Sequence, residues 1–137
     1  MAIESAFCVQ AKLDFMTGVH TPDDVYCMAL YGGTADLDEH VTVYTPKGET
    51  KGDGYQAGGL VLTGYKATIV GKKAVLTWNN PMWAGRTKIT AEGALIYNRT
   101  KHNAAIAVIS FDASFSSENA EFEIEMPTGA SAIVRIA

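Results

Sequence analysis

The pattern of hydrophobic and polar positions changes near residue 60. Before it lie one stretch with helical spacing and one continuous apolar run, whereas after it apolar residues alternate in short segments separated by turn residues. Short strands with turn signals at this spacing are typical of an antiparallel sandwich or barrel. We therefore expect a mainly β fold, a β-sandwich or barrel of about seven to eight strands over residues 25–136. The predicted strands of the second part are 60–63, 66–70, 74–78, 88–97, 104–111, 121–126 and 132–136.

One short N-terminal helix is predicted over residues 5–16. Phe7, Leu13 and Met16 return at helical spacing, with Ser5 as a plausible N-cap and Gly18 as a stop. A helix of about three turns is marginal alone, so it should pack on its own sheet or on a neighbouring subunit. Phe7, Leu13 and Met16 are therefore candidate interface residues.

Two runs are apolar on both faces, 25–31 and 104–111. Strands of this kind are covered on both sides, and the second run fits a central strand that could also contact a partner.

The remaining segments are expected to connect these strands. Residues 71–73 predict a hairpin and 99–103 a tight connection. Residues 112–120 are expected to form a polar loop. Residues 34–40 could make one helical turn, and 41–44 a short strand.

Residues 121–126 alternate strictly between acidic and apolar side chains. Glu121, Glu123 and Glu125 should share one face of a strand. Because like charges on one face repel, that face must lie in water or opposite basic groups. These three carboxylates are candidate interface residues.

The charge is distributed unevenly along the chain. The net charge of −4 combines −6 over residues 1–60, +6 over 66–101, five acidic residues without a basic one over 112–125, and the single basic Arg135. Such segregation is either ordinary solvated charge or a set of complementary patches that align copies or dock the protein on a larger assembly. Lys72, Lys73 and Arg86 are the basic interface candidates.

Length and composition limit the classes that fit. The chain has 137 residues, 47% of them hydrophobic and 19% charged, which indicates a single folded domain over residues 1–137 and excludes a disordered tail. Its acidic balance predicts no general affinity for nucleic acid. No apolar run approaches the ~20 residues of a membrane span, and the N-terminus lacks the basic region of a signal peptide, so no membrane partner is expected. Cys8 and Cys27 are expected to be buried thiols.

The sequence shows no catalytic or metal-binding constellation. His20, His40 and His102 lack metal spacing, and residues 36–40 lack the order of a calcium loop. The glycine-rich segment 47–59 lacks the Gly-Lys-Ser/Thr ending of a phosphate loop, so we interpret it as a packing loop anchored by Tyr55. We therefore predict that the protein is not an enzyme and uses no cofactor and no metal.

Two tryptophans leave an alternative open. Trp78 and Trp83 flank residues 79–82 and either fill the end of a sandwich core or form a platform for a sugar. Trp78 ends an alternating strand, which favours the core. If a glycan is bound, Trp83 and Tyr55 are its candidate contacts.

Several segments together resemble a family of small, β-rich virion structural proteins of tailed bacteriophages. They are 28–31, 52–59, Trp83, 89–98, the strand that ends at Phe111, and 132–136, and the resemblance covers roughly residues 25–136. Its motifs are packing and turn signatures without an active site. The resemblance implies a multi-copy, homo-oligomeric component of the virion, made in the host bacterial cytoplasm, whose partners are other virion proteins.

The resemblance leaves the position in the particle open. A compact module without coiled-coil heptads could be a decoration or cement protein that binds the major capsid protein, which we favour. The alternatives are a tail- or fibre-associated adaptor, and a glycan-binding β-sandwich module.

Overall fold

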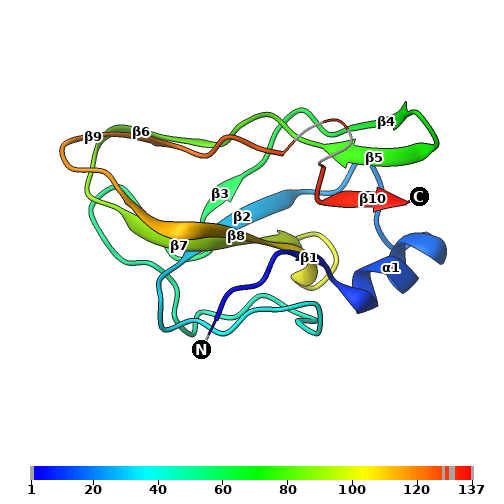
Figure 1. Cartoon of the computed structure of the whole chain (residues 1–137), viewed down its shortest axis with the longest axis horizontal. Coiled ribbons are helices and arrows are strands. Elements are labelled where there is room, and N and C mark those ends of the chain that lie inside the picture. The colour runs from blue at the N-terminus through cyan, green and yellow to red at the C-terminus, as the bar shows by residue number, and fades with distance from the viewer. Residues whose placement is uncertain (1, 128, 130–131, 137) are drawn as a thin grey trace.

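A computed structural model describes residues 2–127, 129 and 132–136, and Figure 1 shows its arrangement. The predicted domain also includes residues 1, 128, 130, 131 and 137, which lie outside the described residues. The described chain forms one helix and ten strands. They are β1 (Ala6–Phe7), α1 (Val9–Met16), β2 (Tyr26–Tyr31), β3 (Leu60–Val61), β4 (Lys66–Val70), β5 (Lys73–Thr77), β6 (Met82–Thr87), β7 (Thr90–Asn98), β8 (Ala104–Ser116), β9 (Ala120–Glu123) and β10 (Val134–Ile136).

The strands form three sheets. The largest has the order β1-β8-β7-β2-β3, the second β10-β5-β4, and the third is the ribbon β6-β9. All these pairings are antiparallel. The predicted mainly β class with antiparallel strands and a short N-terminal helix is confirmed. Of the two predicted architectures, a closed barrel does not occur in the part of the chain that is described.

The core lies around the centre of the largest sheet. Every residue of β2 is buried, as are most residues of β7 and the first half of β8. Figure 1 shows the two smaller sheets on one side of this sheet and the long connections between β2 and β3 on the other. Trp78 and Phe122 from the first side and Leu37 from the second belong to one hydrophobic cluster. The prediction that these strands are covered on both faces is confirmed.

The N-terminal prediction is partly wrong. Ala6 and Phe7 pair with Val108 and Ala107 as β1, and the helix begins only at Val9. Ser5 does not cap it, because its hydroxyl accepts a hydrogen bond from the amide of Ser110 at 2.8 Å. The helix end is as predicted.

Gly18 follows α1 with φ +79°, a left-handed conformation that favours glycine. The Gly18 amide donates a hydrogen bond to the Phe15 carbonyl, and the Val19 amide donates one to the Asp14 carbonyl, as in a Schellman motif.

The predicted loop over residues 112–120 is also wrong, since β8 continues to Ser116. Residues 82–87 form β6, which the sequence did not predict, because Gly85 and Arg86 interrupt any alternation. Residues 41–44 contribute only an isolated bridge between Val43 and Ala104. Residues 34–40 form no helical turn.

Three local predictions are confirmed. The β4–β5 hairpin turns through Gly71 and Lys72 between the paired residues Val70 and Lys73. The 99–103 connection joins β7 directly to β8. Cys8 and Cys27 are free and buried, and burial, with a smaller contribution from Asp38, raises the pKa of Cys8 to about 11.

Candidate interaction surface

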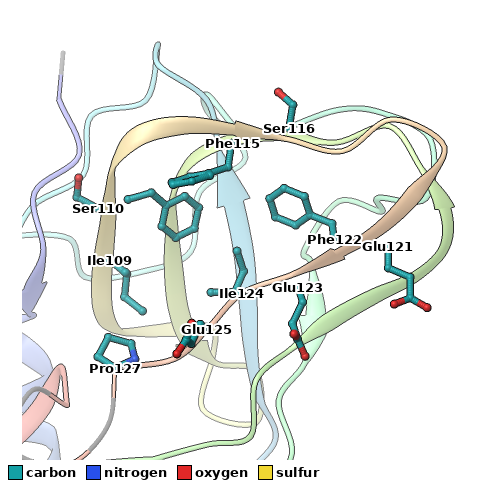
Figure 2. Close-up of a pocket in the computed structure, with 11 residues that line it drawn as sticks. Ile109, Ser110, Phe115, Ser116, Glu121, Phe122, Glu123, Ile124, Glu125 and Pro127 are labelled. Carbon is teal, nitrogen blue, oxygen red and sulfur yellow. The ribbon is translucent and has the colours of Figure 1, made fainter.

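An apolar groove of about 560 Å³ lies between β8 and the β9 segment. Figure 2 shows its side chains, which come from β8 and from the β9 segment that folds back along it. Its walls are Ile109, Phe111, Phe115, Phe122, Ile124 and Pro127, and its polar lining is Ser110, Ser116, Glu121, Glu123 and Glu125. The groove therefore combines a phenylalanine-rich interior with three carboxylates.

An irregularity in β8 produces one wall. The pairing of β7 with β8 shifts between Ala91 and Gly93, whose partners are Phe115 and Ser110. The extra residues on β8 include Asp112 with φ 58°, held by a hydrogen bond with Ser110. A bulge bends its strand and redirects side chains. Here it brings Phe111 and Phe115 edge to face, with ring centroids 6.1 Å apart.

The β9 segment forms the other wall. Trp83 pairs with Phe122 across the β6–β9 ribbon, and their rings meet edge to face at 6.2 Å. Phe122 and Ile124 are buried, whereas Glu121, Glu123 and Glu125 are exposed. The predicted alternation of this strand is confirmed, and it gives the strand an apolar side and an acidic side.

The three carboxylates have no basic partner among the residues that the structure describes. Within the described part of the chain, no lysine, arginine or histidine nitrogen lies within 4.0 Å of Glu121, Glu123 or Glu125. Their mutual repulsion is therefore relieved only by water in the isolated chain. A basic partner at this edge would relieve it further.

The basic interface candidates do not form one patch. Lys72 and Lys73 lie on the β4–β5 hairpin, together with Lys66. Arg86 lies on β6, the strand that pairs with β9. Lys72 and Arg86 are exposed and Lys73 is half-buried. The structure thus separates the hairpin lysines from Arg86.

The helix candidates differ in exposure. Phe7 is half-buried and packs edge to face on Phe15, with centroids 5.8 Å apart. Leu13 and Met16 are 54% and 82% exposed, because α1 buries only Ala11. Leu13 and Met16 are therefore available for a contact, whereas Phe7 mainly holds the helix to the sheet.

The glycan candidates do not form a platform. A sugar stacks on an exposed ring face, and Trp83 is only 4% exposed, packed against Phe122 and Tyr55. The Tyr55 hydroxyl accepts a hydrogen bond from the amide of Leu30 and donates one to Glu49. Trp78 is buried, as the sequence favoured.

Glu49 organises the glycine-rich segment. Its carboxylate accepts hydrogen bonds from the hydroxyls of Tyr44 and Tyr55 and from the amide of Gly58, the last at 2.8 Å. Burial, together with the Glu49 carboxylate, raises the pKa of Tyr44 to about 12. The tyrosines are therefore neutral donors at physiological pH. This confirms Tyr55 as the anchor of the loop.

A second polar cluster joins the start of β2 to the β7–β8 turn. Asp24 accepts hydrogen bonds from Asn98 at 2.8 Å and from Lys101 at 3.1 Å. The Asn98 amide also contacts Nδ1 of the buried His20, whose pKa is lowered by burial. These groups hold loops together. In the described residues, no three His, Cys, Asp or Glu side chains are placed to hold a metal ion.

Sequence reasoning missed the groove itself. The sequence pattern predicts a strand that ends at Phe111 and a polar loop that contains Phe115, and neither prediction indicates a groove. The signal was two phenylalanines within a segment otherwise rich in serine and acidic residues, since apolar side chains in such a loop need a surface to cover.

The comparisons with known proteins gave no match, whether to protein-family models, to curated protein sequences or to solved structures. Among the described residues, no helix has the length and apolar character needed to cross a membrane.

Proposed function

We propose that this chain is a non-catalytic structural component of a tailed-phage virion, present in many copies and bound to other virion proteins. The observation that carries the proposal is the open, phenylalanine-lined groove, whose carboxylates pair with no basic group in the described part of the chain, because exposed apolar patches edged by polar groups are typical of protein contacts. The sequence resemblance described above supports the same function.

The roles of the polar clusters agree with a structural protein. Glu49 and Asp24 each accept several hydrogen bonds that hold loops onto the central sheet. Their hydrogen-bonding capacity is used within the fold rather than directed toward a cleft. We favour a decoration or cement role on the capsid, with a tail- or fibre-associated role as the alternative.

Immunogold electron microscopy of purified particles tests this proposal. An antibody against the chain should label intact particles of the phage that encodes it. Label over the heads supports the decoration role, and label over tails or fibres supports the alternative. Particles without label, with the chain detected only in the soluble fraction of the lysate, would overturn the proposed function.

A further inference from the structure

Two surfaces of this chain complement each other in charge, apolar character and strand geometry. The groove at β9 has an acidic side and an apolar interior. The β4–β5 hairpin carries Lys66, Lys72 and Lys73, and Ile69 on β4 is 78% exposed. No carboxylate oxygen among the described residues lies within 4.0 Å of these lysine nitrogens. The acidic, apolar groove and the basic hairpin with its exposed Ile69 are therefore complementary in charge and in apolar character.

Both surfaces are strand edges. β4 pairs only with β5, and β9 pairs only with β6, among the described strands. An unpaired edge presents free backbone donors and acceptors to any strand that comes alongside. Addition of a strand from another chain to such an edge is a common mode of recognition.

The side-chain alternation of the two strands matches. In β9 and its continuation, Phe122 and Ile124 face one side and the glutamates the other. In β4, Ile69 and Ala67 share one side, and Lys66 lies on the opposite side. Side by side in one sheet, β4 and β9 can place Ile69 over the phenylalanines and Lys66 beside the glutamates. Lys73, opposite Val70 in the hairpin, shares the side of Lys66.

The two surfaces of a single copy cannot meet. Figure 1 shows β4 and β5 toward one end of the long axis, whereas the β6–β9 ribbon extends toward the other. The hairpin of one copy must therefore reach the groove of another.

We infer that the occupant of the groove is the β4–β5 hairpin of a second copy of this chain, added beside β9. The contact is heterologous, since different surfaces of the two copies meet, so it repeats into a ring or an open row. This inference rests on the proposed function, because a multi-copy particle component needs a repeated contact.

Charge exchange provides the test. One variant reverses the hairpin (Lys66→Glu, Lys72→Glu, Lys73→Glu), and a second reverses the groove (Glu121→Lys, Glu123→Lys, Glu125→Lys). In sedimentation velocity, wild-type protein should associate as concentration rises, and each variant alone should associate more than about tenfold more weakly. An equimolar mixture of the two variants should recover association, because both contacts between unlike copies are then complementary. Salt at about 0.5 M should weaken wild-type association, because it screens exposed charges.

Controls separate charge from folding. Lys47→Glu with Lys51→Glu changes exposed lysines outside both surfaces and should associate like wild type. Ile69→Asp alters one exposed side chain and should weaken association without lowering the melting temperature. Carbodiimide coupling of isotope-labelled with unlabelled copies should link hairpin lysines to the β9 glutamates between copies. This coupling needs no folded triple variant.

Three results would overturn the inference. They are a wild-type monomer at every concentration, variants that fold but do not recover association when mixed, and loss of association in the groove variant while the hairpin variant associates like wild type, which would point to another occupant. Labelled particles together with a monomeric chain would remove the inference and leave the proposed function. If the chain self-associates but the antibody labels no particle, the proposed function is removed and the contact between copies remains.

Discussion

The central sheet and the β4–β5 hairpin are both antiparallel β structure, yet they bury their residues very differently. Every residue of β2 is buried between its neighbours β7 and β3, whereas four of the five residues of β4 are exposed. Burial of apolar area is the main favourable term in folding. The central sheet therefore determines stability, and the hairpin edge leaves its side chains available for contacts. Substitutions that affect one region and not the other test this division.

The largest loss of stability is expected at Trp78. Its ring packs against Tyr26 and Tyr65, with ring centroids 5.4 Å and 5.9 Å apart. Trp78→Ala should lower the free energy of unfolding by about 3–5 kcal/mol, because it removes a large buried side chain and leaves a cavity. Urea denaturation followed by circular dichroism measures the change. A loss below about 1 kcal/mol would place Trp78 outside the stabilising core.

A smaller loss of unfolding free energy is expected at Gly59, where the glycine-rich segment lies close to the backbone of β2. Gly59 has φ +80°, and an added Cβ would lie 1.8 Å from the Met28 carbonyl oxygen. Gly59→Ala should therefore cost about 2–3 kcal/mol, since both the conformation and the close approach oppose a side chain. Gly71→Ala, in the hairpin turn with open space around it, should cost about 1 kcal/mol. Equal losses in urea denaturation would contradict the division between the regions.

The polar cluster at the start of β2 should make stability depend on acid. Burial alone would raise the pKa of Asp24, but hydrogen bonds from Asn98, Lys101 and Thr21 outweigh it and lower that pKa from 3.8 to about 2. A depressed carboxyl pKa stabilises the fold above its unfolded value, and this contribution is lost as pH falls from about 4 to about 2.

Asp24→Asn tests this contribution. The wild type should exceed the variant in unfolding free energy by about 1–2 kcal/mol more at about pH 6 than at about pH 2. Denaturation curves at several pH values measure the difference. A gap that does not change with pH would show that the Asp24 charge does not contribute.

The smallest effect is expected on the hairpin edge. Ile69→Ala removes an exposed side chain and should change the free energy of unfolding by less than about 0.5 kcal/mol. A loss above about 1.5 kcal/mol in urea denaturation would mean that β4 belongs to the stabilising core.

The same two regions show what the sequence could predict. The continuous apolar run of β2 and the Gly-Lys turn of the hairpin are local signals, and both predictions are confirmed. β1 and β6 were missed because their partners lie about a hundred and about forty residues away along the chain, and no local pattern indicates such pairing.

The groove was missed for a similar reason. The alternation of Glu121, Phe122 and Glu123 predicts the strand that forms one wall, with its acidic and apolar sides, but not the groove beside it. The other wall depends on the bulge at Asp112, a non-glycine residue with positive φ that no glycine or proline turn signal marks. Sequence position alone groups Arg86 with the hairpin lysines, whereas strand pairing places it on β6, beside β9.

Quantitative mass spectrometry of gradient-purified particles tests most directly whether this chain is a multi-copy structural component. We expect the chain at a fixed ratio to the major capsid protein or to a tail protein, unchanged between preparations and after a salt wash that removes loosely bound proteins. Absence from particles, or a trace amount that varies between preparations, would contradict it.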